Sequence, residues 1–136
     1  MVAYVVDASA AVEHLLRTPV GLSLAGVLDE ADLHAPELID VEVISALRRG
    51  VLGHGLSAER AGAAVADLLN WPLQRIPHRL LGAAAWELRH NFSAYDACNV
   101  AAARRLGLGL VTADGPLARA PGAGITIHNV SSARPG

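Results

Sequence analysis

The sequence of 136 residues contains no lysine, and all 11 of its basic residues are arginine. A P-loop nucleotide site requires the lysine of its G-K-[ST] motif, and a phosphate-receiver domain normally has a lysine beside its acidic pocket. The absence of lysine therefore argues against both classes. The formal net charge of −2 gives no overall attraction for nucleic acid, so a polyanionic partner would be bound by local arginine clusters or through cations.

Cysteine, aromatic residues and long apolar runs are also scarce. The single cysteine, Cys98, cannot form an internal disulfide, which predicts a reducing, cytoplasmic location. No window supplies roughly 18 uninterrupted apolar residues, so we expect no membrane span. Apolar residues make up 52% of the chain and aromatics only 4%, which predicts a core of Ala, Leu and Val. The length fits one domain, expected over residues 1–130, followed by a flexible tail over 131–136.

Short apolar runs alternate with helical patterns along the chain. The runs predict strands at residues 2–6, 32–36, 72–77, 109–114 and 125–130. Between them we expect helices over residues 10–17, 19–31, 37–51, 57–70, 79–90 and 94–106, and a short helical turn after Pro116. Ser9 and Ser57 are the expected N-caps of the first and fourth helices. This alternation predicts an α/β domain with a mainly parallel sheet flanked by helices on both faces.

Four of the 13 acidic residues stand in unusual places. Asp7 and Asp114 each follow an apolar strand, at the carboxyl edge where open parallel sheets bind ligands. Glu42 borders the apolar stripe of the helix over 37–51. Asp96 lies in the first turn of the helix over 94–106, whose middle is apolar nearly all round.

Each acid has a structural alternative. Ser93 and Asp96 match a capping box, Asp7 and Asp114 could be N-caps, and Glu42 could pair with an arginine. The combination favours chemistry, because four carboxylates in one pocket repel each other unless their pKa values rise or a cation binds. Oxygen ligands without paired His or Cys favour Mg²⁺, with Mn²⁺ as a substitute, over zinc.

Four segments, "YVVDASA", "DVEVISALRRG", "SAYDACNVAAARRLG" and "LVTADGPL", together resemble the PIN domain, and specifically the VapC-type toxins of bacterial toxin–antitoxin pairs. The resemblance covers nearly the full chain, in the right order. It implies a metal-dependent endoribonuclease with strand order 3-2-1-4-5. It also implies that Asp7 and Asp96 are the principal metal ligands and that Glu42 and Asp114 complete the catalytic pocket, directly or through water.

The resemblance further implies a mechanism and a set of supporting residues. A bound Mg²⁺ would polarise the phosphate and activate a water, so that products carry a 5′-phosphate and a 3′-hydroxyl. Small hydroxyl residues often support the pocket in this family, at the positions of Ser9 and Thr112. Asn99 either donates a hydrogen bond to a ligand or water, or is a side-chain amide on the helix whose hydrogen bonds are made within the protein.

The remaining polar residues allow two interpretations. Two arginine pairs, Arg48 with Arg49 and Arg104 with Arg105, are either solvated helix ends or contacts to RNA phosphates. The six histidines show no i, i+4 pair and are interpreted as a scattered surface population.

The same resemblance predicts the binding partners. We expect an RNA substrate and a VapB-type antitoxin. DNA would be contacted only indirectly, through the antitoxin, and no interaction with a membrane is expected. Apolar residues of the helices over 10–17, 19–31 and 57–70 fit a homodimer and a groove for a partner helix, although core burial explains them too. Two other functions stay open: a catalytically silent PIN-like module that binds RNA or protein, and a phosphatase using Asp7 as nucleophile, which would want D-x-D where this chain has Ser9.

Overall fold

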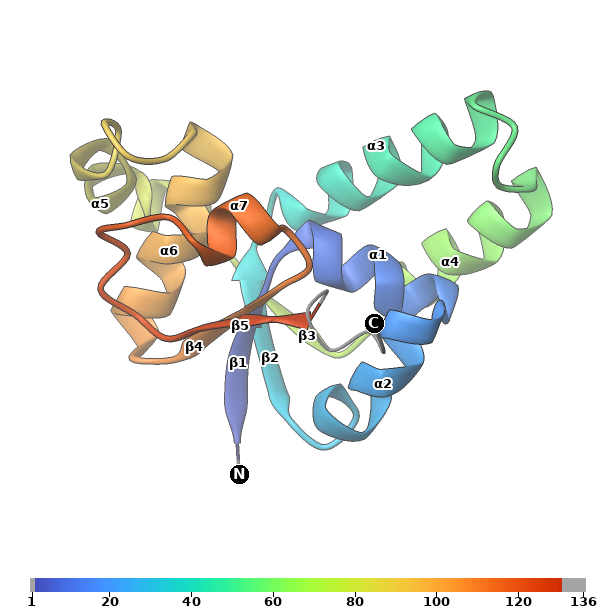
Figure 1. Cartoon of the computed structure of the whole chain (residues 1–136), viewed down its shortest axis with the longest axis horizontal. Helices are drawn as coiled ribbons and strands as arrows, with labels where there is room; N and C mark the ends of the chain where they lie inside the picture. The colour runs from blue at the N-terminus through green and yellow to red at the C-terminus, as the bar shows by residue number, and fades with distance from the viewer. Residues whose placement is uncertain (1, 131–136) are drawn as a thin grey trace.

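A five-stranded parallel sheet forms the centre of the molecule in the computed structural model, which describes residues 2–130 (Figure 1). The strands are β1 (Ala3–Val6), β2 (Asp32–Pro36), β3 (Leu73–Ile76), β4 (Gly109–Thr112) and β5 (Ile127–Asn129). Their order across the sheet is β3-β2-β1-β4-β5, and every neighbouring pair is parallel. The expected fold class and the order 3-2-1-4-5 are therefore confirmed.

Helices fill the connections between the strands. They are α1 (Ala8–Leu16), α2 (Pro19–Leu28), α3 (Ile39–Leu52), α4 (Ala58–Asn70), the 3₁₀ helix η1 (His78–Leu80), α5 (Gly82–Glu87), α6 (Ala94–Leu106) and α7 (Gly115–Ala118). Figure 1 shows α1 to α4 on one side of the sheet and α5 to α7 on the other. In residues 2–130 no helix is both long enough and apolar enough to cross a membrane.

Alternation along the central strands produces two separate cores. Val6 of β1 and Val111 of β4 pack with α1 to α4, whereas Val5 and Leu110 pack with α5 to α7. Successive side chains of a strand point to opposite faces, so both faces of these strands are buried. This explains why β1 and β4 read as continuous apolar runs.

Some predicted helix bounds differ from the structure. The first helix begins at Ala8 rather than residue 10, because Asp7 and not Ser9 is its N-cap. The helix expected over 19–31 ends at Leu28. The helix expected over 79–90 is wrong: it divides into η1 and α5 and ends at Glu87. Leu88 and Asn91 donate to carbonyls three residues back, which tightens the chain into turns, and Leu88 is buried. The tail predicted over 131–136 lies outside the described residues.

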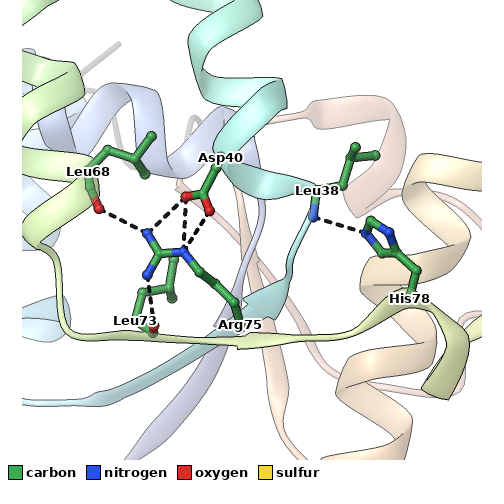
Figure 2. Close-up of polar contacts among 6 residues, drawn as sticks. All are labelled: Leu38, Asp40, Leu68, Leu73, Arg75 and His78. Carbon is green, nitrogen blue, oxygen red and sulfur yellow. Dashed lines mark hydrogen bonds and ion pairs between the residues drawn. The ribbon is translucent and has the colours of Figure 1, made fainter.

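Arg75 of β3 fixes the start of α3. Its guanidinium binds the Asp40 carboxylate through Nε (2.8 Å to Oδ2) and Nη2 (2.9 Å to Oδ1), as Figure 2 shows. The same group donates to the carbonyl oxygens of Leu68, near the end of α4, at 2.9 Å and of Leu73 at 3.0 Å. One planar cation therefore connects α3, α4 and β3.

His78 completes the attachment of α3. The Leu38 N–H donates to His78 Nε2 at 3.0 Å, so Nε2 is the unprotonated ring nitrogen (Figure 2). His78 Nδ1 lies 3.5 Å from Glu37 Oε1. Because Leu38 precedes the first residue of α3 and has no side chain that could cap the helix, the imidazole satisfies an amide at this end.

Gly21 allows α1 and α2 to approach closely, which generates a stability prediction. A Cβ at Gly21 would lie 1.8 Å from the Glu13 carbonyl oxygen, whereas a Cβ at Gly26 of the same helix would meet nothing within 4 Å. We expect Gly21→Ala to lower the free energy of unfolding by about 1–3 kcal/mol, the cost of overpacking. Gly26→Ala, the matched control, should raise it by about 0.5–1 kcal/mol. Urea unfolding measures both, and equal effects would contradict the close approach.

Candidate active site

Asp7 is the buried acid at the carboxyl end of β1. Its side chain is 5% exposed. Oδ1 accepts from the Ala10 N–H at 3.0 Å and from Ser9 Oγ at 2.7 Å, and Oδ2 accepts from Thr112 Oγ1 at 2.5 Å. Three donors therefore fix this carboxylate, two from α1 and one from β4.

Ser9 and Thr112 each have one hydroxyl proton, and both protons point to Asp7. Their oxygens accept in turn, Ser9 Oγ from the Ala113 N–H and Thr112 Oγ1 from the Asp114 N–H, each at 2.9 Å. The two hydroxyl oxygens lie 3.2 Å apart, but neither hydroxyl donates to the other, because both protons are used on Asp7. This network joins the carboxyl ends of β1 and β4 and places Asp7 beside Asp114.

The other three acids come from three separate helix starts. Asp114 is the N-cap of α7, and its Oδ1 accepts from the Leu117 N–H at 3.2 Å. Asp96 lies in the first turn of α6, with its own N–H donating to the N-cap Ser93 at 3.2 Å. Glu42 lies in the first turn of α3 and, within residues 2–130, has no ion pair. The alternative in which an arginine neutralises Glu42 is therefore wrong.

All four acids line one cavity of about 660 Å³ above the carboxyl ends of the central strands. Its lining residues come from α1, α3, α6 and the segment after β4, which are brought together only by the fold. Ser9 and Asn99 also line it, whereas Thr112, 0% exposed, lies beneath. Asn99 is 4% exposed and its Nδ2 donates to the Tyr95 carbonyl at 3.4 Å, which is the satisfied state of this amide.

Burial and mutual repulsion raise the pKa values of Asp7, Glu42 and Asp96. Burial raises the pKa of Asp7 above its ordinary value although its three hydrogen bonds oppose the change. Burial, and then the charges of Asp7 and Asp96, raise the pKa of Glu42. Burial, and then the charge of Asp114, raise the pKa of Asp96. The protein therefore holds negative charge in this cavity at an energetic cost.

Sequence reasoning missed Glu13 and left Arg49 undecided. Glu13 lines the same cavity, and because it lies four residues after Ser9 on α1, helical periodicity was the signal that could have found it. Arg49 lines the cavity and its Nη1 donates to Ser45 Oγ at 2.9 Å. Arg48, its neighbour on α3, is exposed and does not line the cavity.

The other arginine pair lies elsewhere. Arg104 donates from Nε to the Ala123 carbonyl at 2.6 Å and from Nη2 to the Gly122 carbonyl at 2.7 Å, so it holds the segment before β5. Arg105 Nη1 donates to the Leu80 carbonyl at 3.5 Å. Both guanidinium groups already have backbone partners, and neither lines the acidic cavity.

The histidines are scattered, as expected, but His14 and His78 have specific partners. His78 accepts from the start of α3, as described above. His14 stacks on Trp71 with ring centroids 5.2 Å apart, and burial lowers its pKa. Both imidazoles serve packing or helix capping, away from the acidic cavity.

The donor set fits a hard divalent cation in its chemistry. Carboxylate oxygens are the ligands that Mg²⁺ prefers, and a cation would relieve the repulsion that raises the pKa values. Among residues 2–130 no three His, Cys, Asp or Glu side chains are placed as a ready metal cage. To close on an ion, the half-buried side chains of Glu42, Asp96 and Asp114 would therefore have to turn toward Asp7, whose own position is fixed by its donors.

Comparisons with known proteins agree with this architecture. The family model of the PIN domain matches residues 4–123. The chain is 39% identical over 127 residues to Ribonuclease VapC12 of Mycobacterium tuberculosis, covering 93% of this chain and 98% of that protein. It is 45% identical over 121 residues to Ribonuclease VapC1 of the same species, covering 87% and 90%.

Solved structures with similar folds come from several organisms. PAE2754 from Pyrobaculum aerophilum superimposes with a TM-score of 0.68 at 21% identity, covering 97% of this chain and 93% of that one. Mycobacterium tuberculosis VapC20, described as a toxin that cleaves the sarcin-ricin loop, has a TM-score of 0.67 at 21% identity, covering 91% and 97%. VapBC2 from Rickettsia felis, bound to a DNA fragment of its promoter, has a TM-score of 0.62 at 14% identity, covering 93% and 98%.

The raised pKa of Asp7 generates a prediction about stability and pH. Since its folded-state pKa lies above the ordinary 3.8, the folded state loses stability relative to the unfolded chain as pH rises through that raised value. In EDTA, Asp7→Asn, which keeps an N-cap residue, should therefore raise the free energy of unfolding at pH 7 and have little effect below pH about 4. Urea unfolding at a series of pH values tests this. The exposed Asp32→Asn is the control, and an effect of Asp7→Asn that does not vary with pH would contradict the expectation.

Proposed function

Because the chain belongs to the PIN domain family and is 39–45% identical to VapC ribonucleases over most of its length, we propose that it is a metal-dependent endoribonuclease toxin. The observation that carries the proposal is the single cavity in which Asp7, Glu42, Asp96 and Asp114 converge. These residues come from distant parts of the chain and are partly desolvated together. Such an arrangement is costly for folding and is typical of a site that binds a cation.

The residues of the chain have distinct tasks in this proposal. Asp7 and Asp96 would hold Mg²⁺, with Mn²⁺ as a substitute, and Glu42 and Asp114 would complete the pocket directly or through water. The chemistry that a bound ion supplies is polarisation of the scissile phosphate and a lowered pKa of coordinated water. Ser9 and Thr112 keep the Asp7 carboxylate oriented through their hydroxyl protons.

Asp7 is poorly placed for the phosphatase alternative. Both of its oxygens accept hydrogen bonds from Ala10, Ser9 and Thr112. The phosphatase chemistry would want a second aspartate at position 9, and Ser9 there donates its only hydroxyl proton to Asp7 Oδ1. The ribonuclease proposal uses Asp7 as an oriented ligand: Oδ1 has two donors and Oδ2 has one, so a lone pair of Oδ2 remains for the cation.

An antitoxin is the partner supported by the comparisons, since VapBC2 is a toxin–antitoxin complex with this fold. We infer that apolar side chains left exposed on this chain form the surfaces for that partner and for a second copy of the toxin. Leu22 and Val27 on α2 are 60% and 46% exposed, and Leu69 on α4 is 64% exposed. The helix α3 was not among those expected to form partner surfaces, but its Val41 is also exposed, at 61%.

RNA cleavage tests the proposed activity. Purified protein should cleave a structured RNA with Mg²⁺ or Mn²⁺, and both EDTA and the variants Asp7→Asn and Asp96→Asn should reduce cleavage to background. Products should end in 5′-phosphate and 3′-hydroxyl, because water rather than the ribose 2′-hydroxyl attacks. Asp32→Asn, an exposed acid far from the cavity, should cleave like the wild type.

Binding of Mg²⁺ is measured separately from cleavage, through the melting temperature of the wild type and the same variants. Mg²⁺ should raise the melting temperature of the wild type and of Asp32→Asn but not of Asp7→Asn, since binding to the folded state alone is stabilising. Cleavage that persists in EDTA, or products ending in a 2′,3′-cyclic phosphate, would refute the proposed chemistry.

Arg49 should bind a phosphate of the substrate, because it is the arginine at the edge of the acidic cavity. In the non-cleaving Asp7→Asn background, Arg49→Met should weaken binding of single-stranded RNA and make the slope of log K against log salt less steep by about 0.7. Arg48→Met is the matched control, one residue away and outside the cavity. Equal losses for the two variants, in titrations at several salt concentrations, would show a non-specific charge effect instead.

A further inference from the structure

A second cavity, of about 380 Å³, lies between α5, the turn that follows it and the start of α6. Its lining includes Ala85, Trp86, Arg89, Phe92, Ala94 and Cys98. Phe92 is 8% exposed and forms part of the core, whereas Trp86 is 65% exposed. An indole this exposed is uncommon, because tryptophan is highly buried on average.

Arg89 is held against Trp86. Its Cζ lies 4.6 Å from the centroid of the indole ring, and Nη1 donates to the Trp86 carbonyl at 3.0 Å. In the part of the chain that the structure describes, no carboxylate forms an ion pair with this guanidinium. The rim of the cavity therefore offers a flat aromatic surface and a cation without a countercharge.

The first turns of α6 separate this cavity from the acidic one. Ala94 and Cys98, four residues apart, line the second cavity, and Tyr95 and Asn99, also four apart, line the acidic cavity. Consecutive residues of a helix are rotated by about 100°, so the two cavities lie on adjacent faces of one helix.

We propose that this second cavity binds a nucleobase of the RNA strand whose phosphate enters the acidic cavity, with the base stacked on Trp86 and Arg89. The proposal rests on the proposed ribonuclease function and adds a site for the bases beside the bond that is cleaved. The helix between the cavities is about 10–12 Å wide with its side chains, a distance that a few nucleotides of one strand span.

The chemistry of the rim favours RNA over an apolar peptide. Bases of single-stranded RNA stack on aromatic rings and on guanidinium planes. The phosphates beside these bases would supply the countercharge for the Arg89 guanidinium. An apolar peptide side chain would cover Trp86 but would leave that cation without a countercharge. Stacking depends little on base identity, so the site would contribute affinity for unpaired segments rather than for one sequence.

Tryptophan fluorescence provides the test. The chain has two tryptophans, so Trp71→Phe in the Asp7→Asn background leaves Trp86 as the only reporter in a protein that does not cleave. The probes are a single-stranded oligoribonucleotide of mixed sequence, the same strand with abasic sites, and a fully paired hairpin. We expect the single strand to quench Trp86 emission and to bind more tightly than the other two probes.

Variants of the rim give a second measurement by filter binding or anisotropy with a labelled strand. Trp86→Leu should raise the Kd for the single strand at least about fivefold, and Arg89→Met should also raise it. Leu52→Ala removes a similarly exposed apolar side chain at the end of α3, and Arg79→Met removes an exposed arginine outside the cavity. Neither control should change the Kd, and urea unfolding verifies that all four variants are folded.

Several outcomes would overturn the inference. Equal quenching by the intact and abasic strands, or an unchanged Kd for Trp86→Leu, would reject a base site. A Trp86→Leu variant that binds and cleaves RNA normally but loses a co-expressed antitoxin would assign the cavity to a protein partner instead. The nuclease proposal is judged separately by Asp7→Asn: cleavage that needs Asp7 but not Trp86 would keep the activity and reject this site.

Discussion

The hydrogen bonds of the Asp7 carboxylate connect the two central strands at the edge where the cavity opens. Ser9 donates from the helix after β1 and Thr112 donates from β4, so one buried anion joins segments about a hundred residues apart in sequence. The same hydroxyl oxygens accept from backbone amides after β4 and thereby position Asp114. A buried carboxylate is stable only when such donors surround it, and here the donors also set the geometry of the site.

Around this fixed anion the protein gathers acids that repel it. Glu42 and Asp96 lie in the first turns of α3 and α6, where the helix dipole favours negative charge and offsets part of that repulsion. α3 is attached firmly by the Arg75–Asp40 ion pair and by His78, so Glu42 cannot move away without disturbing β3 and α4. The fold thus uses polar contacts outside the cavity to maintain a concentration of charge inside it.

Much of the architecture was predictable because its signals are local. The helix over 94–106 begins after Ser93 and ends before Gly107, which adopts the left-handed conformation of a C-cap, as its residue types indicated. Ser9 and Asp7 are both residue types that cap helices, and only the structure identifies Asp7 as the N-cap of α1, because its Oδ1 accepts from the Ala10 N–H. The helix expected over 79–90 failed because burial of Leu88 and Phe92 favours turns that periodicity does not reveal.

The sequence by itself determined the residue chemistry: apolar runs that must be buried on both faces, helix caps, and acids placed directly after strands. The resemblance to the PIN domain implied that these acids share a pocket, but the residue pattern alone does not give the distance between side chains about a hundred residues apart. Only the order of the parallel strands brings Asp7, Glu42, Asp96 and Asp114 to one cavity with Glu13 and Arg49. The tertiary structure also decided that Arg104 binds carbonyls, since hydrogen-bond partners depend on which segments pack together.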